Sequence, residues 1–276
     1  MPELPEVETV RRGLEPVLCG QRITDVEVRR PNLRIPFPPD FARRLAGRRV
    51  TGLRRRAKYL LVDLDDGEVV ICHLGMSGHF IVRRRTNSPP GPHDHVVFTL
   101  EDGNEVVFND QRRFGLMTIV AGTAEDDHRL LRHLAPDPLD NSFTSKTFLA
   151  RLAGRRTPVK AALLNQQVVG GVGNIYASES LHQARISPRR LAAHVGPGRA
   201  AVLAGALVDV LHRAIAAGGA SLRDHVQTSG EPGYFQHDFR VYGRGNDPCP
   251  TAGCAGTIRR IIQSGRSTYL CGHCQR

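Results

Sequence analysis

The sequence of 276 residues contains no hydrophobic run long enough to cross a membrane. No apolar stretch follows its first residues either, which excludes a secretory signal peptide. We therefore expect a cytoplasmic protein with no membrane partner. No internal repeat is evident, and the length allows one large domain or two to three smaller ones.

Acidic residues are in short supply. There are 27 Asp and Glu residues against 38 Lys and Arg residues, so the formal net charge is +11 and the pI is near 10.0. A basic chain of this kind usually binds a polyanion, most often nucleic acid. A basic bias of the whole proteome, or association with the ribosome, is the alternative explanation. We favour nucleic acid as the binding partner over these explanations.

Cysteine is scarce outside the end of the chain. Cys19 and Cys72 stand alone and are expected to be buried thiols. The other four cysteines are spaced as Cys249-x4-Cys254-x16-Cys271-x2-Cys274. Two thiolate pairs on either side of a hairpin can surround one tetrahedral Zn²⁺ ion, whereas disulfides are disfavoured without a secretory signal. We predict one structural zinc ion on a hairpin that turns at residues 264–266.

Between residues 20 and about 120, the pattern of hydrophobic residues is typical of strands. The predicted strands are at 22–29, 53–64, 68–82, 95–100 and 105–108. Two connections between these strands carry hairpin signals, namely Asp65-Asp66-Gly67 and the stretch 101–104. This half therefore predicts an antiparallel sandwich or barrel, with a basic, breaker-rich loop at 83–92.

From about residue 130 the hydrophobic period becomes helical. Helices are expected at 145–152, from Thr157-Pro158 to 164, at 174–181 and at 199–217, and Ser187-Pro188 repeats the capping signal. Residues 221–247 contain many helix breakers and predict a mobile loop. The fold class is thus α+β and multidomain, divided into 1–125, 130–245 and 246–276.

The first eight residues, Met-Pro-Glu-Leu-Pro-Glu-Val-Glu, combine two prolines with three carboxylates. Pro5 and Glu6 suit the opening turn of a helix, because a missing N–H costs little there and negative charge favours the helix dipole. Apolar residues then recur at helical spacing, at Val7, Val10, Leu14 and Val17. Taken alone, the octapeptide is best explained as an acid-capped amphipathic helix without a catalytic role.

A chemical role becomes possible if Met1 is removed. Pro2 then carries a free secondary amine at the positive end of a helix, where the neutral form is favoured. A neutral amine is a nucleophile of the Schiff-base type, and the adduct of a secondary amine with an aldehyde carbon is a cationic iminium. Glu3 is adjacent and could donate or accept protons.

The opening Met-Pro-Glu-Leu-Pro-Glu-Val-Glu-Thr resembles the start of bacterial formamidopyrimidine-DNA glycosylases, which are bifunctional repair enzymes for oxidised purines. Further matches follow in order over nearly the whole chain, at 54–60, 74–78, 109–115, 170–179 and 263–268. The resemblance implies that a helix and a β-sandwich carry the chemistry. It also implies that a helix–two-turn–helix domain and a zinc finger clamp damaged double-stranded DNA.

The resemblance also implies catalytic roles. Pro2 would attack C1′ of the everted nucleotide, Glu3 would donate a proton and contact the sugar, and Glu6 would be a supporting carboxylate. Lys58 would point at the phosphates of the lesion, with the nucleophile as its alternative role. By itself, a charged stretch such as 54–58 is more often a solvated face.

Other residues would bind DNA. Met76, Arg112 and Phe114 resemble the set that fills the space of an everted base, although each alone is an ordinary residue of a core or surface. The remaining candidates are Lys160, a basic active-site position; Asn174 and Arg266, which would contact phosphate; and His93. Arg266 is counted with the catalytic residues too. His93 and His95 flank Asp94, where a metal pair is disfavoured.

Two other functions remain open. One is the pyrimidine-preferring sister enzyme, endonuclease VIII, against which Leu4 and the set of Met76, Arg112 and Phe114 argue. The other is a non-catalytic zinc-finger protein that binds DNA, against which the intact Pro2 argues. We expect a monomer that is associated with the bacterial nucleoid through its DNA.

Overall fold

The chain folds into two compact units. The computed structural model describes residues 1–85, 89–221, 228 and 230–276. The first unit comprises Met1–Arg132 and Ala217–Tyr234, and the second comprises His133–Ala216 and Phe235–Arg276. This division differs from the three predicted ranges, 1–125, 130–245 and 246–276. Residues 217–234 belong to the first unit, and the cysteine-rich end shares the second unit with the helices.

Within its described residues, the first unit contains a long helix, α1 (Leu4–Leu18), a short helix, α2 (Phe41–Leu45), and eight strands. The strands are β1 (Ile23–Val28), β2 (Val50–Arg56), β3 (Tyr59–Leu64), β4 (Glu68–His73), β5 (His79–Arg84), β6 (Asp94–Leu100), β7 (Asn104–Asn109) and β8 (Leu116–Ala121). They form two four-stranded sheets, ordered β1-β6-β7-β5 and β2-β3-β4-β8, in which neighbouring strands are antiparallel. The predicted antiparallel sandwich is confirmed.

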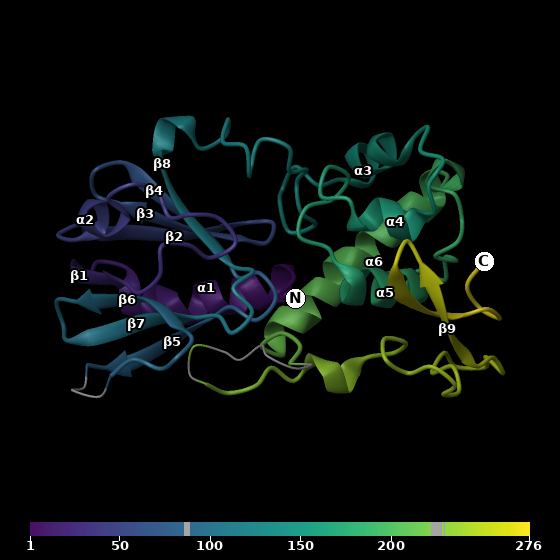
Figure 1. Ribbon diagram of the computed structural model, residues 1–276. Helices are drawn as coiled ribbons and strands as arrows, with labels where there is room; N and C mark the ends of the chain where they lie inside the picture. Colours follow the sequence, from purple (N-terminus) through teal and green to yellow (C-terminus); the bar gives the residue numbers. More distant parts are fainter. Residues whose placement is uncertain (86–88, 222–227, 229) are drawn as a thin grey trace. The chain divides into compact units, whose positions relative to one another are not determined.

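Helix α1 is fixed by the core of this sandwich. Figure 1 shows α1 running between the two sheets. Its buried face consists of Val7, Val10, Leu14 and Leu18, which belong to one apolar cluster with residues of both sheets. Full burial of a leucine such as Leu14 contributes roughly 1.5–3 kcal/mol. This packing holds the N-terminal end of α1, where Pro2 and Glu3 lie, in a defined place within the unit.

Two predicted strands were wrong in extent. The run 53–64 is divided into the paired strands β2 and β3, which turn at Ala57 and Lys58. The run 68–82 is divided into β4 and β5, which lie in different sheets and are joined by residues 74–78. Ala57 adopts a positive φ of 53°, a conformation that a turn usually assigns to glycine, so no turn signal was visible there.

The second unit is helical and ends in a hairpin. Its α-helices are α3 (Ser145–Leu152), α4 (Val159–Leu164), α5 (Asn174–Gln183) and α6 (Pro197–Ala216), and its strands are β9 (Ile258–Gln263) and β10 (Arg266–Cys271). Short 3₁₀ helices are η1 (Gly122–Ala124) in the first unit and η2 (Ala192–His194) and η3 (Phe235–Asp238) in the second. Helix α6 packs against α3 and α5, and α5 packs against β10.

Most local signals of this unit are confirmed. Helix α6 ends before Gly218 and Gly219, both with positive φ, as the double glycine predicted. The capping signal at Ser187-Pro188 is followed by a turn and not by an α-helix. In the part of the chain that is described, no helix is both long and apolar enough to span a membrane. The predicted loops at 83–92 and 221–247 include residues 86–88, 222–227 and 229, which lie outside the described residues.

Candidate functional site

The N-terminal end of α1 is built as a capping box. Glu3 is the N-cap residue, and its backbone N–H donates to Glu6 Oε2 at 2.8 Å. Pro2, Glu3 and Glu6 are buried, whereas Met1 is 58% exposed. The stretch therefore forms the capped helix start that its sequence predicted. Pro2 and Glu3 are buried at this helix start.

Glu6 has a second partner that the sequence did not indicate. Its Oε1 accepts a hydrogen bond from the backbone N–H of Ala220 at 2.9 Å. The preceding Gly219 has a φ of 81°, and a Cβ there would lie 3.2 Å from Glu6 Cγ and Oε1. Ala220 belongs to the first unit, and Glu6 holds it beside the start of α1.

Lys58 lies in the turn between β2 and β3, and the residue is 6% exposed. The turn is held from behind by Arg55, whose Nη1 donates to the Ala57 carbonyl at 3.0 Å. Arg55 Nε also donates to Glu8 Oε2 at 3.1 Å. Glu8 on α1 and the turn that carries Lys58 are thereby connected through a single arginine.

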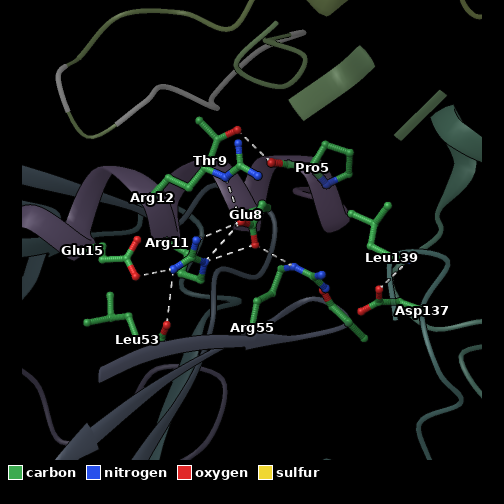
Figure 2. Close-up of polar contacts among 11 residues, drawn as sticks. Pro5, Glu8, Thr9, Arg11, Arg12, Glu15, Leu53, Arg55, Asp137 and Leu139 are labelled. Carbon is green, nitrogen blue, oxygen red and sulfur yellow. Dashed lines mark hydrogen bonds and ion pairs between the residues drawn. The ribbon is translucent and has the colours of Figure 1, made fainter. Parts of the chain in front are cut away.

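Figure 2 shows Glu8 at the centre of this network, where it also accepts hydrogen bonds from Arg11 and Arg12. Burial opposes its ionisation, but the hydrogen bonds from Arg11 and Arg12 lower the pKa of Glu8 below its ordinary value. The sequence showed Glu8 only as one of three carboxylates near the N-terminus. Its partner Arg55 is 47 positions away, so no local pattern could have shown the pair.

Two loops of the first unit bring three predicted DNA-binding residues together. Met76 lies in the loop 74–78 and is half-buried, and Arg112 and Phe114 lie exposed in the loop 110–115. The guanidinium carbon of Arg112 is 5.1 Å from the centroid of the Phe114 ring. A Cβ on Gly75 would lie 2.2 Å from the Phe114 carbonyl carbon, so the two loops touch where only glycine fits. The His93 carbonyl accepts from the Asp110 N–H at 3.0 Å, which places His93 beside the second loop.

His73, which the sequence analysis did not single out, supports the first loop. Its Nδ1 accepts a hydrogen bond from the Gly75 N–H at 2.9 Å, and its ring lies edge-on to Tyr59. Burial, together with the nearby positive charges of Lys58 and Arg34, lowers the pKa of His73 to about 4. His73 is therefore neutral at neutral pH, as its role as an acceptor requires.

In the second unit, Lys160 is an internal anchor. It is 1% exposed, and its Nζ donates to Asn174 Oδ1 at 2.6 Å, to the Ser267 carbonyl at 3.1 Å and to Thr268 Oγ1 at 2.7 Å. Asn174, the first residue of α5, also donates through Nδ2 to the Ser267 carbonyl at 3.0 Å. The structure thus brings Asn174 next to the hairpin. Its partner there, Ser267, directly follows the exposed Arg266.

Glu179 is a second anchor that the sequence analysis missed. Its carboxylate accepts hydrogen bonds from the backbone N–H groups of Arg240, Val241 and Tyr242 at 2.8–3.0 Å. Burial raises the pKa of the Glu179 carboxyl, although these three donors oppose the shift. A glutamate inside a helical pattern carries no local sign of such partners, which follow it by more than 60 residues.

The four predicted cysteines form one cluster. Their Sγ atoms all lie within 4.8 Å of one another, and the pairs Cys249–Cys274 and Cys254–Cys271 are 3.8 and 3.7 Å apart. Zinc–thiolate bonds of about 2.3 Å give a tetrahedron with edges of about 3.8 Å, so the cluster fits Zn²⁺. A Cβ on Gly256 would come within 2.6 Å of Cys271 Sγ, so this position has room only for glycine.

Comparison with known proteins agrees with this geometry. The N-terminal domain of formamidopyrimidine-DNA glycosylase matches residues 1–117, the H2TH domain of the same enzyme matches 134–226, and a zinc finger found in FPG and IleRS matches 246–276. The chain belongs to the formamidopyrimidine-DNA glycosylase family. The zinc-finger match and the cysteine geometry together show that this member of the family holds one structural zinc ion.

Relatives match the chain over its full length. Formamidopyrimidine-DNA glycosylases of Cereibacter sphaeroides and Methylocella silvestris are each 54% identical to it, over 283 and 292 residues, with 100% of both chains covered. A crystal structure of MutM (Fpg) from Thermus thermophilus is 39% identical and superposes with a TM-score of 0.87, covering 99% of this chain and 98% of that one. A Lactococcus lactis Fpg mutant bound to Fapy-dG-containing DNA is 31% identical, with a TM-score of 0.90 and 100% of both chains covered.

Proposed function

We propose that this glycosylase family member removes oxidised purines, such as 8-oxoguanine and formamidopyrimidines, from duplex DNA and then cleaves the strand as an AP lyase. The observation that carries the proposal is the buried helix start, where Pro2 and Glu3 lie side by side ahead of a capped helix. Full-length relatives named formamidopyrimidine-DNA glycosylase support it. Solved relatives are bound to Fapy-dG DNA and to DNA with an abasic site.

The chemistry begins with removal of Met1, which frees the nitrogen of Pro2. The positive end of α1 favours the neutral amine, which attacks C1′ of the damaged nucleotide. The bond from C1′ to the base breaks, and the base leaves with the bonding electrons and takes up a proton, which balances the proton that the Pro2 nitrogen gives up. The nitrogen loses its own proton and then drives the opening of the sugar ring, with Glu3 as the proton donor to O4′.

The product of ring opening is a cationic iminium that joins Pro2 to C1′. Because it withdraws electrons, it acidifies the C2′ hydrogen. Loss of that proton expels the phosphate at C3′, and a second elimination, through loss of the C4′ proton, expels the phosphate at C5′. Glu6 supports this centre by holding the helix start and residue Ala220 together.

Contacts with DNA are assigned by the chemistry of each side chain. Met76 and Phe114 would fill the space that the everted base leaves, and Arg112 would donate to the unpaired base opposite. Lys58, Asn174 and Arg266 would contact phosphates, because cationic and N–H donors bind them well. Lys160, whose ammonium group lies inside the second unit, would act on DNA through Asn174 and not by direct contact. His93 would help to shape the site beside loop 110–115.

Substrate preference separates the two candidate enzyme activities, the purine-preferring glycosylase and the endonuclease VIII-like enzyme. The names of the relatives favour oxidised purines over an endonuclease VIII-like preference. One solved relative, wild-type Lactococcus lactis Fpg, is bound to DNA that contains an oxidised pyrimidine, so both lesion classes belong in the assay. We expect the protein to act as a monomer on damaged double-stranded DNA at the nucleoid, in the cytoplasm.

Borohydride trapping tests the role of Pro2. We expect the mature protein to start at Pro2 and to form a borohydride-stable adduct with DNA that contains 8-oxoguanine. An uncleaved N-terminal tag, or Pro2→Gly, should abolish or sharply reduce both excision and trapping, because the secondary amine is blocked or lost. The matched control is the same tagged protein after a protease has removed the tag up to Pro2, which should recover full activity. Full activity with the tag in place would exclude Pro2 and make Lys58 the candidate nucleophile.

A further inference from the structure

One buried carboxylate connects the two loops that carry Met76, Arg112 and Phe114. Asp110 follows β7 and has no exposed surface. Its Oδ1 accepts a hydrogen bond from Ser77 Oγ at 2.5 Å, and its Oδ2 accepts from the Gly115 N–H at 2.7 Å. The carboxylate therefore bonds to the loop 74–78 on one side and closes its own loop, 110–115, on the other.

Ser77 completes the connection. Its hydroxyl donates to Asp110 and accepts from the backbone N–H of Arg112 at 3.0 Å. Ser77 is 3% exposed and follows Met76 directly. One hydroxyl thus holds the backbone of Arg112 to the loop of Met76, away from competing water.

The backbone of Asp110 is itself held by the strand beside it. Its N–H donates to the His93 carbonyl at 3.0 Å, and its carbonyl lies 2.9 Å from His95 Nε2. Arg113, which follows Arg112, takes a positive φ of 56° and donates its N–H to the Asp110 carbonyl. The turn that directs Arg112 outward is therefore closed on Asp110 as well.

We propose that Asp110 and Ser77 are positioning residues that join Met76, Arg112 and Phe114 into one rigid unit for insertion and for readout of the opposite base. The inference rests on the proposed function, since it assigns the source of precision at the same site. Arginine offers only donors, which suit the acceptors O2 and N3 of cytosine better than the edge of adenine. Such readout requires that the guanidinium be held in a fixed place, and the Ser77 hydrogen bond to the Arg112 N–H supplies this.

Single-turnover excision of 8-oxoguanine from two duplexes, opposite cytosine and opposite adenine, tests the proposal. We expect the wild type to excise faster opposite cytosine. Ser77→Ala, which removes only the hydroxyl, should lower this rate ratio about tenfold, within the range that one polar base contact supplies. Ser77→Thr keeps the hydroxyl and should retain most of the ratio. Asp110→Asn keeps the shape and one acceptor oxygen, and should fall between the two.

The matched control is Leu45→Ala. Leu45 is fully buried in α2, and its truncation destabilises the same unit without removing a hydrogen bond from either loop. If Asp110 and Ser77 contributed stability alone, Leu45→Ala would change the ratio as much as Ser77→Ala does. An unchanged ratio in Ser77→Ala would overturn the inference.

Hydrogen exchange in the free protein gives a readout that needs no DNA. The amide protons of Arg112 and Gly115 should exchange faster in Ser77→Ala than in the wild type or in Leu45→Ala. Unchanged exchange at both amides would also overturn the inference. If the wild type excised no lesion from either duplex, the proposed function would fail, and the exchange data alone would then decide whether the loops are coupled through Ser77.

Discussion

His73 shows how burial changes the chemistry of a single side chain. In water its imidazole would be partly protonated near neutral pH. Inside the first unit, burial and the positive charges of Lys58 and Arg34 keep it neutral, and its Nδ1 accepts from the Gly75 N–H. The same physical cause, desolvation, raises the pKa of Glu179. Burial thus favours the neutral form of both groups, although one would be a cation and the other an anion when charged.

A pH dependence of stability follows from His73. Its pKa is lowered from 6.5 to about 4 in the folded protein. Between these values the unfolded chain binds more protons, so the free energy of unfolding rises with pH. The contribution of His73 is fully present above about pH 6.5 and is lost as the pH falls toward 4.

Urea denaturation at about pH 5 and about pH 7.5 measures this effect. His73→Asn retains an acceptor for the Gly75 N–H but cannot titrate, so its difference between the two pH values should be smaller than that of the wild type. His182, whose pKa burial also lowers to about 4, is present in both proteins and cancels in the comparison. Equal pH dependence in the two proteins would contradict the assignment.

At the scale of elements, α1 and the β2–β3 turn are joined by charged groups on top of the apolar core. The side chains of Glu8 and Arg55 are 11% and 9% exposed, and Arg55 continues to the Ala57 carbonyl. A hydrogen bond between charged groups that are shielded from water is stronger than a surface ion pair. Helix α1, which directly follows Pro2 and Glu3, and the turn that carries Lys58 are therefore held to each other by a specific contact.

A double-mutant cycle measures that contact. Glu8→Gln and Arg55→Met should each lower the free energy of unfolding by about 1–3 kcal/mol, and the double mutant should lose less than the sum. Arg12→Ala is the control, because the Arg12 side chain is 59% exposed and its pair with Glu8 should contribute less than about 1 kcal/mol. Urea denaturation gives the free energy of unfolding of the wild type and of all four variants. Strict additivity of Glu8→Gln and Arg55→Met would show that the two groups do not interact.

At the scale of the whole molecule, the zinc site is part of the second unit. Lys160 joins α4 to Asn174 on α5 and to Ser267 and Thr268 of the hairpin. His182 on α5 places its Nε2 3.5 Å from Cys249 Sγ, next to the metal ligands. A hairpin with so small a core depends on the metal for its stability, and through these contacts the neighbouring Arg266 depends on it too.

Removal of the metal should therefore affect DNA binding and leave the first unit intact. Cys271→Ser should lose zinc and duplex binding, while far-UV circular dichroism and proteolysis show that residues 1–120 stay folded. Metal content can be followed by mass spectrometry and affinity by fluorescence anisotropy. Arg266→Ala is the matched variant: it should retain zinc, and the slope of log affinity against log salt should fall by about one unit for the lost phosphate contact. Normal DNA affinity of zinc-free protein would refute this dependence.

Local signals in the sequence predicted most of the elements and the metal site, but neither helix α2 nor strand β8. The start of α1 was predictable because Pro5 and Glu6 act on the helix within one turn, and Asp65-Asp66-Gly67 sets the turn between β3 and β4 by itself. The spacing of the cysteines predicted the cluster because each pair meets the other across one short hairpin. In each case the interacting groups are close in the chain, so residue type and spacing were sufficient.

Contacts between distant residues were decided only by the tertiary structure. The turn at Ala57 carries no glycine. It is held by Arg55, which also donates a hydrogen bond to Glu8, 47 positions earlier in the chain. Ser77 meets Asp110 across 33 positions, and Lys160 meets Thr268 across 108. A buried hydrogen bond of this kind forms only after the core has brought both groups together and excluded water, because in the open chain each group is solvated by water instead. The sequence alone therefore determined most of the elements and the metal of this protein, and the packing of the core decided which polar side chains support its site.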